Sequence, residues 1–440
     1  MVRAGLILSA QLFNLLVFNL LAFSGLARAE IPPLPQHADA THLGVASCAS
    51  SVCHGAINPK EDGNVLQNEY RTWSQYDRHA RAYKTLLSDA SKAMAKKLGL
   101  EAAHTAKVCL DCHTDNVAAG KRGTRFQLSD GIGCEGCHGG AEKWIKSHTE
   151  PSTTHAQNVA AGLYPTEDPH ARAELCLSCH LGTSEKLASH DIMGAGHPRL
   201  SFELDTFTVL QPEHYKLDDD YRKRKGPVTP PQVWLAGQLR TAEQTLELLA
   251  SGRFHDGGMF PEISFYDCHA CHHPMNQLRW QPGDGLKPGA LRLNDASLQL
   301  TAILLTVLAP DQSGPWRDAM IALQRAGQKS PAAVGQQAQA MIQQLKPWLK
   351  LADQPLTRAQ QAGVAKALLR EGARGTLRDY TSAEQMVMGV ALMITSLGLD
   401  KSMNNSLDTL YQALEDEHRF DPGRLSKVAG QVQADLERRL

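Results

Sequence analysis

Apolar residues are concentrated at the amino terminus, where a run from about Leu6 to Leu26 follows Arg3. Ala27-Arg28-Ala29 then supplies the small-x-small pattern of a cleavage site. An anchor helix that stays uncleaved is the alternative, but polar side chains interrupt the run. We therefore predict a signal peptide over residues 1–29. Because no later stretch reaches about 18 uninterrupted apolar residues, we expect no membrane span in the mature chain.

Residues 30–210 lack long runs of helical or strand periodicity and are rich in glycine, histidine and short polar turns. In residues 211–290 the pattern changes. A charged stretch, Asp218–Lys225, indicates a solvated linker, with a docking patch for an acidic partner as the alternative. Thr229 then caps a predicted helix from Pro230 to about Ser251, which has leucine and alanine along one face.

Residues 291–440 show repeated helical periodicity, contain no cysteine and have one histidine. Ser330 before Pro331 is typical of a helix start, and Thr381–Glu384 has the form of a capping box. This pattern predicts a bundle of some five to seven helices without chemistry of its own.

The candidate chemistry lies in the cysteines. All ten occur as pairs, and each pair is followed directly by histidine. Four pairs have a two-residue spacer, and the first pair has a four-residue spacer. In chain order the five motifs are Cys48-Ala49-Ser50-Ser51-Val52-Cys53-His54, Cys109-Leu110-Asp111-Cys112-His113, Cys134-Glu135-Gly136-Cys137-His138, Cys176-Leu177-Ser178-Cys179-His180 and Cys268-His269-Ala270-Cys271-His272.

The sequence Cys-x-x-Cys-His is the attachment signature of a c-type haem. Both thiols bond to the porphyrin, and the histidine becomes the proximal iron ligand. Zinc ribbons and structural disulfides also use paired cysteines, but neither explains the invariable following histidine. We therefore predict five covalent haem c groups, at haem sites numbered 1–5 in motif order. Their proximal ligands would be His54, His113, His138, His180 and His272.

Haem also explains the weak periodicity of residues 30–210, because several porphyrins can replace an aliphatic core. We predict a mainly α fold, in which a haem-packed multihaem cytochrome c domain precedes an α-helical bundle. The expected parts after the signal peptide are a tetrahaem domain (30–210), a linker, helix and fifth motif (211–290), and a haem-free helical domain (291–440).

The charge of the chain limits its partners and its location. The formal net charge of −1 becomes −3 when Arg3 and Arg28 leave with the signal peptide. This balance lacks the basic excess that nucleic-acid binding requires. Covalent haem attachment and the predicted signal peptide together indicate a periplasmic protein.

Each iron can bind a second, distal ligand, and histidines outside the motifs are candidates. His79 lies among aromatic residues in segment 70–83, which we expect to be helical. His190 and His197 flank a Gly-x-Gly turn and could point at two different irons. Further candidates, for haem site 5, are His214 and His255.

Residues 44–182 resemble the multihaem cytochrome c-554 family, also described as cytochrome c-552/4-like. The resemblance lies in the order of elements: the first motif, Trp73 followed by His79, Val108–His113, Gly131–Gly139 with His148 some ten residues on, and Leu175–His180. Family members are electron carriers that work beside hydroxylamine oxidoreductase in ammonia oxidation. By this resemblance, His79 and His148 would be distal ligands. The long first spacer, the fifth motif and the rest of the chain depart from the family pattern.

The resemblance implies electron transfer with redox partner proteins, such as other cytochromes or a membrane quinol-oxidising complex. In the family the second haem lacks a sixth protein ligand, and here His190 or His197 could close that position. If one iron stayed open, the alternative would be an oxidoreductase acting on a small nitrogen or sulfur oxide. A haem-binding docking subunit of a respiratory complex is a third hypothesis, suggested by the helical tail.

Overall fold

The computed structural model describes residues 31–63, 65–255, 261–272, 286–287 and 289–440. By its internal contacts the chain separates into Met1–Pro33 and Leu34–Leu440, and the second unit contains all five motifs. The predicted signal peptide, residues 1–29, lies outside the described residues. Within those residues, no helix combines the length and the apolar character needed to cross a membrane.

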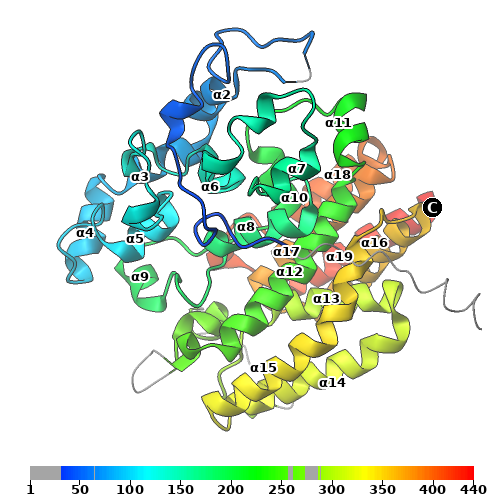
Figure 1. Cartoon of the computed structure of the whole chain (residues 1–440). Coiled ribbons are helices and arrows are strands. Elements are labelled where there is room, and N and C mark those ends of the chain that lie inside the picture. The colour runs from blue at the N-terminus through cyan, green and yellow to red at the C-terminus, as the bar shows by residue number, and fades with distance from the viewer. Residues whose placement is uncertain (1–30, 64, 256–260, 273–285, 288) are drawn as a thin grey trace, which may run out of the picture. The chain divides into compact units, whose positions relative to one another are not determined.

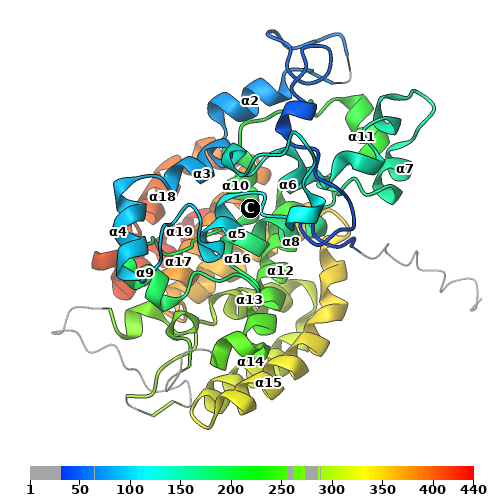
Figure 2. The same cartoon turned by 60° about the vertical axis from the view of Figure 1, so that its left-hand side comes forward.

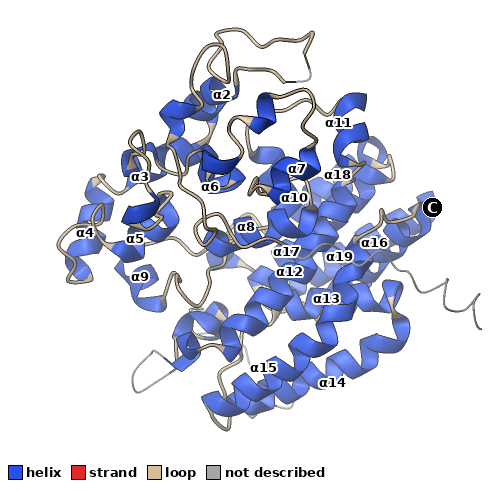
Figure 3. Cartoon of the chain, viewed as in Figure 1, coloured by secondary structure: helices blue, strands red, loops and turns tan. Residues whose placement is uncertain are grey.

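The first part of the second unit consists of short helices joined by long loops (Figure 1). Figure 3 shows the same arrangement of helices and loops by secondary structure. Over the described ranges, β pairing is confined to two isolated bridges, His42–Arg122 and Tyr266–Leu293. The prediction of a mainly α fold is therefore confirmed. The α-helices of this part are α2 Glu69–Tyr76, α3 Ala82–Thr85, α4 Asp89–Lys97, α5 Lys107–His113, α6 Cys134–His138, α7 His155–Ala160, α8 Pro169–His180, α9 His190–Ala195 and α10 Leu204–Leu210.

Longer helices follow, and they pack against one another in both views of the chain (Figures 1 and 2). Seven of them lie beyond residue 291, within the predicted range. The α-helices of this part are α11 Asp219–Lys225, α12 Pro230–Ala250, α13 Ala296–Leu308, α14 Pro310–Gly327, α15 Pro331–Leu345, α16 Arg358–Ala373, α17 Tyr380–Ser396, α18 Asp400–Gln412 and α19 Pro422–Arg439.

One aliphatic core joins α12 to the helices that follow it. Trp234 of α12 is fully buried in a cluster with residues from α13 to α19. On another side, Val233 packs with Leu177 of α8 and Leu204 of α10. Helix α12 therefore connects the haem-motif part with the bundle. A separable domain beginning near residue 291 remains a prediction.

Three local expectations differ from the structure. The predicted helix over 70–83 is interrupted at Asp77, which is extended and whose side chain accepts a hydrogen bond from the backbone N–H of His79. The expected linker includes helix α11, because Asp218 caps it and acidic residues precede basic ones along it. Helix α17 is capped by Asp379, so the predicted capping box at Thr381 is wrong.

Candidate haem sites

Short helical turns present four of the five motifs. The second, third and fourth motifs lie in α5, α6 and the last turn of α8, and the fifth begins in the 3-10 helix η9, Cys268–Ala270. The first motif forms a turn without a helix, as its longer spacer requires. A single helical turn places the two cysteines on one side of the backbone and the histidine next to them. This is the arrangement that attachment to one porphyrin edge needs.

Every motif histidine faces a histidine from outside the motifs. The separations between ring centroids are nearly equal, although the paired residues come from different parts of the chain. The pairs are His54 with His148 (6.2 Å), His113 with His197 (6.3 Å), His138 with His214 (6.3 Å), His180 with His79 (6.2 Å) and His272 with His190 (6.5 Å).

These separations have the value that ligation of one metal ion by two imidazoles requires. With a metal–nitrogen bond of about 2 Å on each side, two imidazoles on opposite faces of one ion have centroids about 6.4 Å apart. Ordinary aromatic pairs have centroids anywhere from about 4.5 to 7 Å apart, so the near equality of the five separations is the distinguishing feature of these pairs. The space between each pair of rings would therefore accommodate one iron ion held by both imidazoles.

Hydrogen bonds at Nδ1 orient most of these rings. A ligating imidazole usually donates its other ring N–H to a carboxylate or a carbonyl, which fixes the ring and the tautomer. Carboxylates serve His54 and His79, and backbone carbonyls serve four more of the paired histidines. The bonds run from His54 to Glu69 (2.9 Å), His79 to Asp77 (2.9 Å), His113 to Ala82 (3.0 Å), His148 to Trp144 (3.3 Å), His197 to Pro198 (2.8 Å) and His214 to Pro212 (3.2 Å).

The remaining histidines have other surroundings. His42 is fully buried and uses both ring nitrogens, toward Asp115 at 2.7 Å and the carbonyl of Pro35 at 3.3 Å. His155 pairs with Glu167 at 2.5 Å. His255, a candidate distal ligand from the sequence, is exposed and has its ring beside Phe254. Ring pairing thus separates ligand candidates from histidines that serve the fold.

Burial favours the neutral imidazole at the centre of the site. It lowers the pKa of His138 to about 3, and His214 contributes to the same shift. Burial also raises the pKa of the Cys176 thiol to about 12. At His54 a carboxylate has the opposite effect, because the hydrogen bond with Glu69 raises the pKa of this histidine. Neutral imidazole is the form that binds a metal.

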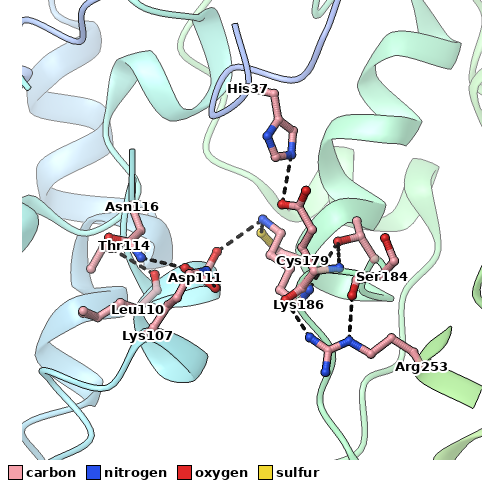
Figure 4. A network of polar contacts seen from close by, with 12 residues as sticks. His37, Lys107, Leu110, Asp111, Thr114, Asn116, Cys179, Ser184, Lys186 and Arg253 are labelled. Carbon is pink, nitrogen blue, oxygen red and sulfur yellow. Dashed lines mark hydrogen bonds and ion pairs between the residues drawn. The ribbon is translucent and has the colours of Figure 1, made fainter. Parts of the chain in front are cut away.

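Contacts between motifs show which haem sites are neighbours. Glu135 in the spacer of the third motif accepts a hydrogen bond from the backbone N–H of Gly44, shortly before Cys48, which brings sites 1 and 3 together. Sites 2 and 4 are also neighbours, because Lys186 contacts both of their motifs. Figure 4 shows Lys186 between these two motifs, donating to the carbonyl of Asp111 at 3.2 Å and to Sγ of Cys179 at 3.0 Å. Sites 3 and 4 are linked through the backbone, because the N–H of Ile132, just before Cys134, donates to the carbonyl of His79, which faces His180 of site 4, at 3.1 Å.

Glu135, in the spacer of the third motif, fixes the backbone segment that precedes the first motif. Its buried carboxylate accepts hydrogen bonds from the backbone N–H groups of Leu43, Gly44 and Ala141, each at 2.7 Å. Leu43 and Gly44 lie just before Cys48, so this carboxylate sets the position of site 1 relative to site 3. The sequence alone held no signal for this role, because two of the partners are backbone groups some ninety residues away.

Residues 47–139 match the family model described as cytochrome c554 and c-prime. This region belongs to the cytochrome c554 family. The expected resemblance is thereby confirmed over the first three motifs, and the chain is a c-type cytochrome with covalently bound haem. Comparisons with curated proteins and with solved structures gave no match.

The structure brings together residues that the sequence could only name as candidates. His214, assigned from the sequence to site 5, lies opposite His138 of site 3, and His190 occupies the place opposite His272. His148, which only the family resemblance indicated, lies opposite His54 with nearly parallel rings. No local signal could give these pairings, because each depends on the packing of distant segments.

Proposed function

We propose that this cytochrome is a periplasmic carrier that passes single electrons through five covalent haem c groups. Cysteines of the five motifs attach the haems, and two histidines hold each iron. The proposed pairs are His54 and His148 at site 1, His113 and His197 at site 2, His138 and His214 at site 3, His180 and His79 at site 4, and His272 and His190 at site 5.

The observation that carries this proposal is the set of equal ring separations, between 6.2 and 6.5 Å, at all five motifs. At each motif the partner of the proximal histidine is a second histidine, and the five partners come from different segments of the chain. Nδ1 hydrogen bonds at six of these rings leave Nε2 as the ligand atom.

Haem supplies reversible one-electron chemistry when it is bound, and the protein sets where and at what potential this happens. The chain's own residues orient the imidazoles and exclude water from the inner sites. Because a histidine faces each motif histidine, the arrangement leaves no iron position for a small substrate. This favours carriage over the alternative of an oxidoreductase acting on a nitrogen or sulfur oxide.

Site 2 of this chain differs from the second haem of the family that the chain resembles. The family's second haem is expected to lack a sixth protein ligand, whereas His197 lies 6.3 Å from His113 here. His197 belongs to the segment beyond the family match, after the fourth motif. We infer that this added segment closes site 2 and makes the protein a carrier, with other cytochromes or a quinol-oxidising complex as its partners.

Substitution of His197 by alanine tests this assignment. The variant should convert one of five low-spin haems to high-spin, as measured by electron paramagnetic resonance of the oxidised protein. The matched control is His255→Ala, since His255 is exposed and faces no motif histidine among the described residues. A low-spin spectrum for His197→Ala, or a high-spin signal in the control, would contradict the proposed ligand pairs.

A further inference from the structure

Helix α9 carries two of the paired histidines at its two ends. His190 is its first residue and lies 6.5 Å from His272 of site 5, while His197 follows its last turn and lies 6.3 Å from His113 of site 2. The helix rises about 1.5 Å per residue, and after it the backbone N–H of His197 donates to the carbonyl of Ile192 at 3.2 Å, so the backbones of these two histidines lie roughly 10 Å apart. Two porphyrins ligated by this one segment must therefore be close neighbours.

Residues from other segments hold both ends of α9. Glu262, which precedes the fifth motif, accepts a hydrogen bond from the backbone N–H of His190 at 2.8 Å. The same carboxylate oxygen accepts from the backbone N–H of Ser264 at 2.9 Å. At the other end, Lys97 of α4 donates to the carbonyl of Ala195 at 3.1 Å. These bonds fix α9 between the loop of site 5 and helix α4.

We propose that α9 joins haem sites 2 and 5, so that the fifth haem extends the haem chain from site 2 and forms one of its ends. This inference rests on the proposed ligand pairs. Glu262 is a positioning residue in this arrangement, because it holds the backbone of the residue that ligates the fifth iron. The contacts between motifs then give the order 1, 3, 4, 2, 5.

The solvent exposure of the motif residues agrees with this order. The motifs at the two ends reach the surface: Cys53 of site 1, and Cys271 and His272 of site 5, are exposed. The cysteines of the middle sites, among them Cys137 and Cys176, are only partly accessible. Electrons would therefore enter at one end haem and leave at the other.

The neighbour relation can be tested by magnetic relaxation. In a His197→Ala background, site 2 supplies a high-spin signal whose relaxation is accelerated by nearby paramagnetic irons, an effect that falls steeply with distance. Removing the fifth haem with Cys268→Ala and Cys271→Ala should slow this relaxation by up to about twofold, because the haem at site 4 remains as the other neighbour. The matched control, Cys48→Ala with Cys53→Ala, removes the haem at the far end and should leave the relaxation unchanged. Equal effects of the two removals, or none, would overturn the order.

A variant that retains every haem guards against misfolding of the four-haem proteins. Glu262→Ala should open the fifth iron in part of the molecules, giving a fractional high-spin signal while the signals of the other haems stay as in the wild type. A fully low-spin Glu262→Ala protein would overturn the role of Glu262. The proposed function has a separate test. An open iron in the unaltered protein would contradict it, whatever the order of the haems.

Discussion

Glu69 accepts a hydrogen bond from Nδ1 of His54, and this contact bears on the potential of the haem proposed at site 1. A carboxylate partner makes the imidazole a stronger donor to the oxidised iron, which lowers the reduction potential. We expect Glu69→Gln to raise the potential of one haem while all haems stay low-spin. An optical redox titration measures the change, with the exposed Glu415→Gln as the control. A lowered potential would contradict the proposed ligation of His54.

Glu135 permits a prediction about stability. Its carboxylate accepts from three backbone N–H groups, two of them buried and that of Leu43 half-buried, and leaving a buried donor unpaired costs about 1–3 kcal/mol. Glu135→Ala should therefore lower the free energy of unfolding by about 3 kcal/mol or more. Denaturant titration followed by circular dichroism measures this loss.

The control for that substitution is Glu142→Ala. Glu142 lies nearby and accepts one hydrogen bond, from the backbone N–H of Thr41, at an exposed position. Its removal should cost clearly less than the removal of Glu135. Equal losses for the two variants would show that the three hydrogen bonds of Glu135 contribute little to the fold.

Residue types and spacing alone name the ten attachment cysteines and the proximal histidines, and these assignments remain predictions. The partners of those histidines were predictable only as a set of candidates. His79, His190 and His197 stood out by their local setting, and His148 by resemblance, but which ring faces which motif is decided by tertiary contacts. His255 illustrates the limit, because a histidine close in sequence to the fifth motif proved to be exposed.

At the scale of elements, the contact between α12 and α17 gives a prediction. A Cβ atom on Gly389 would lie 2.5 Å from Cζ2 of Trp234, so glycine is required where these helices cross. Gly389→Ala should destabilise the protein by about 1–3 kcal/mol through overpacking. The control is Gly335→Ala in α15, where the nearest neighbours of the added carbon are 3.9 Å away.

The two alanine variants should move stability in opposite directions. Alanine at Gly335 should stabilise its helix by about 0.5–1 kcal/mol, because glycine loses more backbone entropy on folding. Thermal unfolding of both variants provides the comparison. Stabilisation by Gly389→Ala would mean that α12 and α17 pack less closely than the structure has them.

Long periodic helices were predicted well, and short ones were not. The leucine pattern predicted α12 as Pro230 to about Ser251, and the structure has it from Pro230 to Ala250. The segment around His79 was harder, because Asp77 turns the chain and caps the following turn at once. Local hydrogen bonding by one aspartate outweighs helical periodicity over so short a distance.

At the scale of the whole molecule, the protein has two kinds of interior. Around the motifs, short helices and loops surround paired histidines, and aliphatic clusters are small. Around α12 to α19, a continuous aliphatic core holds the chain together. The sequence indicated this division through its uneven periodicity, but the shared packing of α12 with both parts came only from the structure.

The central claim is that five haems are bound and that every iron has two histidine ligands. Titration of the reduced protein with carbon monoxide tests it most directly, because the gas binds only an iron with an open position. We predict a protein that carries five haems per chain by intact mass and forms no stoichiometric carbon monoxide adduct at neutral pH. Formation of one adduct per chain would contradict full six-coordination and would favour a catalytic site instead.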